Sequence, residues 1–423
     1  MTSVLVFPAG EINAIELHDA LATCVNIKLF GASSVERHGS YVFKNYISNL
    51  PLISDPGFID VFNKLIKQHH IDVIFPTHDS VSVFMADHQD EIDAKIIGAD
   101  KKTAAICRDK QKTYGLFNDQ SFVPKLVKDF NLTKFPVFVK PKEGQGSVGA
   151  KRIDNLSELK EISLEDYVVV EFLPGDELTV DCLTDKNGEL RVISPRSRER
   201  ILAGVSVAGT TQLLTQEIQS IAEAINRRLV FRGLWFFQIK KDETGRFKLL
   251  EISTRCAGAM GLTRARGINL PLLSVYVALG YDIEVIPNSY TVHFDRTLIS
   301  RYKIDYDYDS VYFDFDDTLI INGMIHPYSI MFLYQCKNHG KKVYLITKHE
   351  KHIKKTLKEY AISEDLFTDI ISLDASGNKI ENIRPDKAIF IDNAFQERKL
   401  VYEKFKIPVF DVDGIEVLLD WRT

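Results

Sequence analysis

The spacing of apolar residues changes twice along the 423 residues of this chain, and this limits the folds that it can adopt. In residues 1–104, short apolar runs alternate with segments of helical spacing, which predicts a parallel sheet with crossover helices. From 105 to 300, β-branched and aromatic runs with glycine-containing turns predict antiparallel hairpins. Strand–helix alternation returns over 308–423. We therefore expect α/β, α+β and α/β domains, with 289–309 as a bridge before the last.

Composition narrows the class of protein. With 45% hydrophobic residues, a net charge of -5 and no long basic stretch, the chain is predicted to be globular and not to bind nucleic acid. Its five cysteines form no Cys-x-x-Cys pair, so a disulfide framework and a zinc ribbon are not expected. The chain has neither an apolar run of about 18 residues nor a basic segment typical of a signal peptide. We expect a cytoplasmic protein without a membrane partner.

A glycine-rich loop, GQGSVG, matches the pattern GxGxxG at residues 144–149. A dinucleotide-binding fold needs a helix after this loop, but a second strand-like segment, AKRI, follows it. No kinase motif follows either. The loop is therefore predicted to be a hairpin whose backbone N–H groups approach phosphates, with Lys140 upstream to contact a phosphate oxygen. A surface hairpin without a ligand is the alternative.

Carboxylates follow the glycine loop at strand ends. Glu171 ends an apolar run and Glu177 follows a Pro-Gly turn, so this segment could hold a nucleobase and a ribose. Glu251 and Gln238 are expected to face each other across a hairpin, where their oxygens could surround Mg²⁺. Arg255 follows closely and could stabilise charge on a transferring phosphoryl group.

Residues 1–300 resemble ATP-grasp enzymes of the carboxylate–amine ligase type, similar to carbamoyl-phosphate synthase. The resemblance rests on the order RDKQK, VFVKPKEGQGSVG, EFLPGDELTVD and LLEISTR. It implies a pre-ATP-grasp α/β domain over 1–104 and an ATP-grasp fold over 105–300. It also implies cleavage of ATP to ADP, activation of a carboxylate as an acyl phosphate, and attack by an amine.

The same resemblance implies roles for individual residues. Arg255 would support the acyl phosphate, and Glu251 would be the main Mg²⁺ ligand, with Gln238 and Ser253 beside it. Gln238 stands where the family usually has an acidic residue and Ser253 where it usually has Asn, so weaker Mg²⁺ binding is expected. The implied nucleotide-binding residues are Lys110, Lys140, Gly144, Gly146, Ser147, Gly149, Glu171, Phe172, Leu173 and Glu177.

The C-terminal segment carries a second motif, VYFDFDDTL, in which Asp314 and Asp316 follow an apolar strand. Asp314 could attack phosphorus and Asp316 could protonate a leaving oxygen. Thr347 and Asp392 end two further predicted strands and could hold phosphate and Mg²⁺. Residues 308–423 thus resemble the haloacid-dehalogenase (HAD) phosphatase superfamily.

This second resemblance implies a Rossmann-like parallel sheet and a lysine that holds the phosphate. Lys379 is the chosen lysine and Lys387 the alternative. The implied metal ligands are Asp314, Asp316 and Asp392, for Mg²⁺ or, as the alternative ion, Mn²⁺. INGMIH is predicted to form a small hairpin. The interval before Thr347 leaves no room for a cap domain, so a capless domain is expected.

Three other groups remain open on the sequence alone. Arg196, Arg198 and Arg200 alternate along one predicted strand and are expected either to meet an anionic substrate or to lie on a solvated face. His349, in the His-rich run KHEKHIKK, could bind a metal but is expected on a solvated helix face, because the run is rich in lysine. Asp79 follows a predicted strand and is expected either to contact substrate or to cap a turn.

Together these features predict a bifunctional protein, an ATP-dependent ligase joined to a Mg²⁺-dependent phosphatase. Its partners would be a small carboxylate, an amine and a phosphorylated substrate. The rival hypothesis is a sensor that binds ATP without ligation and regulates the phosphatase domain. A third alternative is a competent ligase with a purely structural C-terminal domain. The oligomeric state stays open, a homodimer included.

Overall fold

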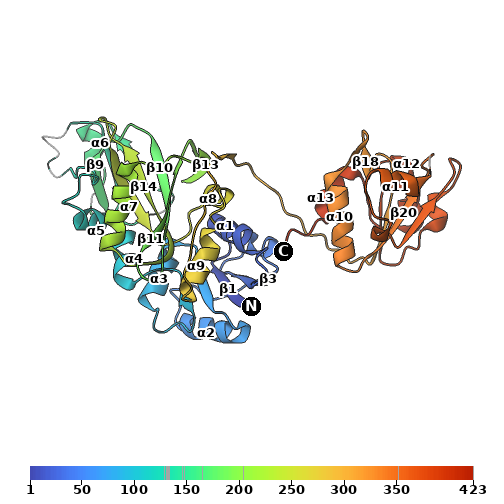
Figure 1. Cartoon of the computed structure of the whole chain (residues 1–423), viewed down its shortest axis with the longest axis horizontal. Helices are drawn as coiled ribbons and strands as arrows, with labels where there is room; N and C mark the ends of the chain where they lie inside the picture. The colour runs from blue at the N-terminus through green and yellow to red at the C-terminus, as the bar shows by residue number, and fades with distance from the viewer. Residues whose placement is uncertain are drawn as a thin grey trace. The chain divides into compact units, whose positions relative to one another are not determined.

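The chain forms two compact units in the computed structural model, Met1–Leu298 and Ile299–Arg422 (Figure 1). The structure describes residues 1–127, 129, 134–144, 146, 148–163, 165–202, 204–350 and 352–422. Among these residues, no helix has both the length and the apolar character needed to cross a bilayer.

The first unit begins with a five-stranded parallel sheet in the order β3-β2-β1-β4-β5. Its strands are β1 (Thr2–Phe7), β2 (Ile27–Ala32), β3 (Asn45–Ile47), β4 (Val73–Pro76) and β5 (Lys95–Ile96). Its helices are α1 (Ile12–Leu21), α2 (Phe58–His69) and α3 (Asp79–Asp87). Alternate residues of β1 enter two cores, because successive side chains of a strand point to opposite faces. Val4 and Val6 pack with Leu17 of α1, whereas Leu5 and Phe7 pack with the residues of α2.

Two short helices lead into a small antiparallel sheet, β8-β7-β9. These elements are α4 (Lys101–Arg108), α5 (Lys110–Leu116), β7 (Val137–Pro141), β8 (Lys151–Ile153), α6 (Leu156–Lys160) and β9 (Tyr167–Glu171). Val137 and Val139 of β7 and Val169 of β9 form an apolar cluster of their own with Ile153 and Leu159. The small sheet therefore has a separate core, and it carries Lys140 on its central strand.

The largest antiparallel sheet has the order β11-β10-β14-β15, and β6 pairs with β14. Its strands are β6 (Gly98–Ala99), β10 (Glu177–Thr184), β11 (Leu190–Ser197), β14 (Phe231–Lys241) and β15 (Phe247–Ser253). One face is apolar: α7 (Gln216–Arg228) covers it and packs Ile221 and Ile225 against Trp235 and Phe237. The opposite face carries the polar residues described below.

The first unit is completed by two helices and a three-stranded sheet, β12-β13-β16. These elements are β12 (Arg200–Leu202), β13 (Val205–Thr210), α8 (Gly261–Ala265), α9 (Leu270–Ala278) and β16 (His293–Asp295). Leu270 and Val275 of α9 pack in one core with Leu234 of β14 and Val4 of β1. This shared core fixes the parallel sheet against the large antiparallel sheet.

The second unit is built on a five-stranded parallel sheet, β21-β20-β17-β22-β23. Its strands are β17 (Ser310–Phe313), β20 (Lys342–Thr347), β21 (Asp369–Ser372), β22 (Ala388–Ile391) and β23 (Val409–Phe410). Its helices are α10 (Pro327–Asn338), α11 (Ile353–Glu359), α12 (Phe395–Phe405) and α13 (Ile415–Leu418), with a 3-10 turn, η3 (Lys379–Asn382). The predicted INGMIH hairpin is confirmed as β18 (Ile320–Ile321) and β19 (Met324–Ile325). Its turn residues Asn322 and Gly323 both have positive φ, as a tight hairpin turn requires.

Candidate functional sites

A row of four polar residues crosses the large sheet of the first unit. Gln238 of β14 lies opposite Glu251 of β15, so the predicted pairing across this hairpin is confirmed. On its other side Gln238 lies opposite Thr179 of β10, which in turn lies opposite Arg196 of β11. Residues directly opposite each other share a face of the sheet. The row is therefore continuous from Arg196 to Glu251 on the face that α7 does not cover.

The two lysines predicted to bind phosphate converge on one end of this row. Lys110 Nζ, at the start of α5, lies 3.8 Å from Glu251 Oε2. Lys140 Nζ, on β7, donates to the carbonyl of Leu250 at 3.0 Å and lies over the ring of Tyr114. Burial, and then the like charge of Lys110, lowers the pKa of Lys140 to about 7. A phosphate group would supply the negative charge that favours the protonated lysine.

A cavity of about 130 Å³ lies between these lysines and the glycine loop. Its walls include the two lysines, Gly144, Gly146, Glu177, Arg198, Gln238 and Glu251. The predicted residue Ser147 lies outside the described residues. Gly204, between β12 and β13, comes so close to Gly146 that a Cβ on Gly204 would lie 2.4 Å from the Gly146 Cα. Glycine is thus required where these two hairpin loops meet.

Gly149 is not among the described residues that line the cavity, and the other four predicted nucleotide-binding residues lie at two places. Glu177 lines the cavity and pairs with Arg198 at 2.7 Å and Lys240 at 3.5 Å. Glu171 instead accepts a hydrogen bond from the backbone N–H of Lys125, and Phe172 lies under the guanidinium of Arg152. Leu173 is buried. None of these last three is among the described residues that line the cavity.

A second cavity, of about 220 Å³, adjoins the first and shares Gln238 and Glu251 with it. Arg255 lies in its wall and makes a two-pronged ion pair with Asp79, with distances of 2.7 and 3.1 Å. Ser253 donates to the same carboxylate at 3.1 Å. Burial opposes ionisation of Asp79, but the paired guanidinium outweighs it and holds the pKa of Asp79 below its usual value. The sequence did not reveal this partnership of Asp79.

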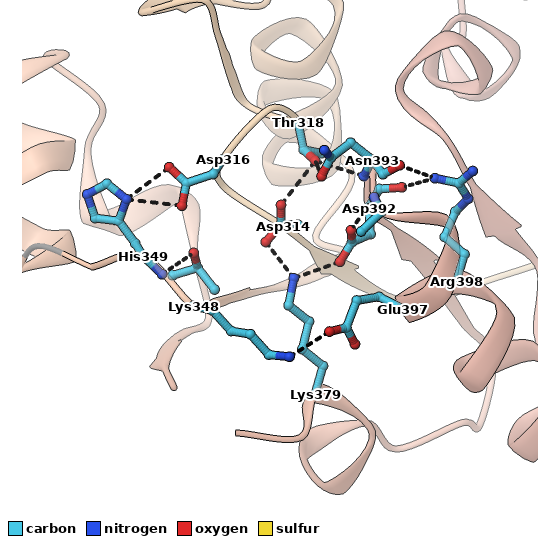
Figure 2. Close-up of polar contacts among 12 residues, drawn as sticks. Asp314, Asp316, Thr318, Lys348, His349, Lys379, Asp392, Asn393, Glu397 and Arg398 are labelled. Atoms are coloured by element: carbon cyan, nitrogen blue, oxygen red, sulfur yellow. Dashed lines mark hydrogen bonds and ion pairs between the residues drawn. The ribbon is translucent and has the colours of Figure 1, made fainter. Parts of the chain in front are cut away.

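In the second unit, three charged residues form a buried cluster. Asp314 and Asp392 follow the neighbouring strands β17 and β22, and Lys379 Nζ lies 2.6 Å from a carboxylate oxygen of each (Figure 2). Thr318 donates to the other oxygen of Asp314 at 3.1 Å and accepts from the backbone N–H of Asn393. The sequence motif brings Thr318 to this place, but its bond to Asp314 was not anticipated.

Two carboxylates share one lysine in this cluster, and the pKa of each is raised above its usual value. Burial, opposed in part by Lys379, raises the pKa of Asp314 to about 6, and the charge of Asp392 adds to the rise. Burial likewise raises the pKa of Asp392. One negative charge remains uncompensated when both are ionised. A hard divalent cation such as Mg²⁺, which prefers oxygen ligands, would neutralise it, so Asp314 and Asp392 fit the implied metal.

Asp316 takes a different position. Its side chain is 53% exposed and accepts from the ring of His349 at 2.9 and 3.0 Å (Figure 2). The prediction of His349 on a solvated helix face is wrong: it lies between β20 and α11, with its side chain 14% exposed. The sequence could have indicated this place, because His349 lies only two residues after Thr347, which ends a strand. Thr347 is buried, and its hydroxyl accepts from the backbone N–H of His349 at 3.1 Å.

In the part of the chain that the structure describes, neither unit presents a preformed metal cage. Among the described residues, no group of three or more His, Cys, Asp or Glu side chains is arranged to hold a metal ion. In the first unit Glu251 and Gln238 offer two oxygen donors, with Lys110 near Glu251. In the second unit Lys379 lies between the two carboxylates, and Asp316 contacts His349. Two oxygen donors per site fit Mg²⁺, which keeps several waters when protein ligands are few.

Comparisons with known proteins bear on the first unit. A family model described as "ATP-grasp in the biosynthetic pathway with Ter operon" matches residues 163–297. Carbamoyl-phosphate synthase of Methanobrevibacter smithii is 27% identical over 279 residues, which are 59% of this chain and 75% of that protein. Part of the chain is therefore similar in sequence to ATP-grasp proteins and to carbamoyl-phosphate synthase.

Solved structures define the fold. L-amino acid ligase from Bacillus licheniformis has a TM-score of 0.53 at 18% identity, covering 66% of this chain and 74% of that one. N5-carboxyaminoimidazole synthetase from Staphylococcus aureus, complexed with ADP, has a TM-score of 0.56 at 14% identity, covering 68% and 78%. The biotin carboxylase domain of Hydrogenobacter thermophilus 2-oxoglutarate carboxylase, in complex with MgADP, has 0.56 at 16%, covering 69% and 73%. The chain therefore contains the ATP-grasp fold, and relatives with this fold bind ADP, one of them with Mg²⁺.

Proposed function

We propose that the first unit is an ATP-dependent carboxylate–amine ligase. In this reaction a substrate carboxylate oxygen attacks the γ-phosphorus of ATP, which breaks the bond to ADP and forms an acyl phosphate. The amine nitrogen then attacks the acyl carbon, phosphate leaves with the electron pair, and the amine loses a proton. The observation that carries the proposal is the convergence of Lys110, Lys140 and the Gln238–Glu251 pair beside the glycine loop.

We assign the following roles in this reaction to residues of the chain. Lys110 and Lys140 would bind phosphate oxygens, because both are buried lysines on one cavity wall and a phosphate favours their protonated form. Glu251 and Gln238, with Ser253 nearby, would hold Mg²⁺, which when bound neutralises charge on the phosphates. Arg255, held by Asp79, would stabilise the acyl phosphate in the adjoining cavity.

The other predicted nucleotide residues complete this proposal. The backbone of the glycine loop would contact phosphates, Glu177 the ribose, and the segment of Glu171, Phe172 and Leu173 the adenine. Glu171 is bound to the backbone of Lys125, which favours a structural part for its carboxylate and leaves the backbone of the segment to meet the base. We further propose a cytoplasmic location and small-molecule partners.

The rival proposal, an ATP sensor without ligation, is favoured by one observation: Gln238 brings no negative charge to the metal site. The test compares Glu251→Gln and Gln238→Glu in the full chain. The ligase proposal expects Glu251→Gln to abolish acid-dependent ADP release, by about 10²-fold or more. It expects Gln238→Glu to lower the Mg²⁺ concentration needed for half-maximal rate. ATP binding without ADP release in the wild type, for every acid and amine tried, would favour the sensor.

We also propose that the second unit is a phosphatase of the HAD type. The buried Asp314–Lys379–Asp392 cluster supports this, because Lys379 can hold phosphate beside the nucleophile. Asp314 would attack phosphorus and form an aspartyl-phosphate as the substrate oxygen leaves with a proton from Asp316. Water would then lose a proton to Asp316 and attack phosphorus, which breaks the bond to the Asp314 oxygen, releases phosphate and regenerates the Asp314 carboxylate. Thr347 would bind a phosphate oxygen, and Asp314 and Asp392, with Asp316 as the third predicted ligand, would hold Mg²⁺.

This second proposal is tested with the full chain and a generic aryl phosphate. Asp314→Asn is expected to abolish phosphate release, whereas Asp316→Asn should slow it and allow an aspartyl-phosphate to accumulate from a substrate with a good leaving group. Wild-type phosphate release by Asp314→Asn would exclude the mechanism. Together the two proposals describe one bifunctional protein.

A further inference from the structure

The second cavity of the first unit contains a buried binding feature that the proposed ligase chemistry does not use. Its wall includes Thr179 and Arg196, the far half of the row that ends at Gln238 and Glu251. Neighbouring strands lie about 4.8 Å apart. Thr179 is therefore one strand from Gln238, and Arg196 two strands, on the same face. A ligand in this cavity can reach both halves of the row.

Arg196 is held rigidly in this wall. It is only 2% exposed, and its Nε and Nη2 donate to the two oxygens of Asp181, at 2.9 and 3.2 Å. Thr263 donates to the same carboxylate at 2.8 Å. Such a two-pronged pair fixes the plane of the guanidinium. The third nitrogen of Arg196, Nη1, is consequently set in one direction by the protein.

The polar atoms left over are the second observation. Arg196 Nη1 and Thr179 Oγ1 are buried and have no hydrogen-bond partner among the described residues. Arg198 Nε, also in this wall, makes no hydrogen bond, but it lies 2.7 Å from Glu177 Oε1. Buried polar atoms almost always have partners. Two unpartnered donors on adjacent strands of one cavity wall point to a ligand that supplies the acceptor.

We propose that Arg196 and Thr179 bind a second carboxylate of the acid substrate, so that the ligase activates one end of a short dicarboxylic acid. This inference rests on the proposed ligase function. The end to be activated would lie toward Glu251 and Arg255, beside the proposed phosphate site. The other end would accept hydrogen bonds from Arg196 Nη1 and the Thr179 hydroxyl. An ionised acceptor suits them better than a neutral amide, because hydrogen bonds to a charged acceptor are about twice as strong.

The other charged residues of the wall already have protein partners. Glu11 pairs with Arg37 at 2.9 Å, Arg255 with Asp79, and Glu251 with Lys110. Arg196 also has a partner, Asp181, but its Nη1 has no hydrogen-bond partner among the described residues. This leaves the row itself as the feature that would select between acids.

The test uses the full chain with MgATP and hydroxylamine, which traps an acyl phosphate as a hydroxamate without requiring the natural amine. Matched pairs differ in one group: succinate and succinamate, aspartate and asparagine, glutamate and glutamine. At least one diacid is expected to react with a kcat/KM about tenfold or more above that of its amide partner. Equal values within every pair would overturn the inference.

Variants separate this site from the nucleotide site. Thr179→Val and Arg196→Lys are expected to raise KM for the diacid about tenfold and to leave that of the amide and the affinity for MgATP unchanged. Arg200→Lys is the matched control, because Arg200 pairs with Asp295 at the surface. A diacid preference that survives both variants would overturn the inference. If the wild type binds no MgATP, or binds it and converts no acid at all, the proposed ligase function fails. If it converts the amide partners but no diacid, only this inference fails.

Discussion

The two parallel sheets of this protein have the same strand order, but uncharged residues follow the central strands of the first and aspartates follow those of the second. In the first sheet β1 and β4 end in register at Phe7 and Pro76, and Pro8 and Thr77 follow. In the second sheet β17 and β22 end in register at Phe313 and Ile391, and Asp314 and Asp392 follow. The topology thus delivers two residues to one place in both sheets. Only the identity of those residues decides whether the place is a closed turn or a charged site.

The consequences are visible in the contacts. In the first sheet the hydroxyl of Thr77 donates to the carbonyl of Pro8 at 2.5 Å, so the strand ends satisfy each other. In the second sheet the two carboxylates require Lys379 between them. The charged residue near the first sheet's edge, Asp79, pairs with Arg255 of the ATP-grasp part. The first sheet therefore supports the neighbouring site of Arg255, whereas the second sheet would hold a site at the ends of its own strands.

The largest expected effect comes from removing the charge that follows β17. Asp314→Asn should lower phosphatase activity by about 10³-fold or more, because the amide is a far weaker nucleophile than the carboxylate. Phosphate release from an aryl phosphate measures it. Asp79→Asn, at the edge of the other sheet, should leave that rate unchanged. A comparable loss in both variants would break the comparison between the sheets.

The second prediction concerns stability and pH. Lys379→Met leaves two buried carboxylates without their cation and should lower the free energy of unfolding of the second unit by about 3–5 kcal/mol at neutral pH. A carboxylate whose pKa is higher in the folded than in the unfolded chain stabilises the fold when protonated and loses that contribution as pH rises. Asp314 and Asp392 already have raised pKa values, and loss of the lysine raises them further.

The loss in free energy of unfolding caused by Lys379→Met should therefore be small near pH 4 and grow up to about pH 8. Scanning calorimetry at several pH values would measure this deficit. Thr77→Val is the matched change in the first sheet. It removes one strand-end hydrogen bond and should cost about 1 kcal/mol at every pH. A pH-independent deficit in Lys379→Met would mean that Lys379 does not alter the protonation of the two carboxylates in the folded protein.

The third prediction tests whether the first sheet serves the neighbouring site. Asp79→Asn should lower ligase turnover about 10- to 100-fold, because Arg255 loses the carboxylate that orients it. Affinity for MgATP should change less than the rate, since Asp79 is not among the described residues lining the cavity with both lysines, although it lines a smaller one with Lys110 and Glu251. Acid-dependent ADP release and calorimetric titration measure the two quantities. If the affinity for MgATP fell as much as the rate, Asp79 would serve the nucleotide site and not only Arg255.

The smallest expected effect is a pH dependence of nucleotide affinity. The pKa of Lys140 is lowered to about 7, so at pH 8 most molecules without bound nucleotide have an uncharged Lys140. Phosphate favours the charged lysine, and binding then takes up a proton. Affinity should fall about tenfold between pH 6.5 and about pH 8.5. Titrations in buffers of different ionisation enthalpy measure the uptake, and Lys140→Arg, which stays charged, should abolish it.

Several features of both sites could be predicted from the sequence because they depend on short-range patterns. Glu251 and Gln238 could be paired because a turn in DETGR fixes the hairpin between them. Asp314 and Asp392 could be placed because each follows an apolar run that ends there. The prediction for His349 went wrong because the lysine-rich run suggested a helix that in fact begins later, at Ile353.

The sequence by itself determined which residues stand at the ends of the strands, since strand period and turns are set by neighbours along the chain. Only the tertiary structure decided which distant groups meet there. Asp79 finds Arg255 across 176 residues, and Asp181 takes two nitrogens of Arg196, whereas the third has no hydrogen-bond partner in the described part of the chain. The physical reason is that a buried charge must be compensated by whichever group packing brings within hydrogen-bond distance. No local pattern of residues specifies that group.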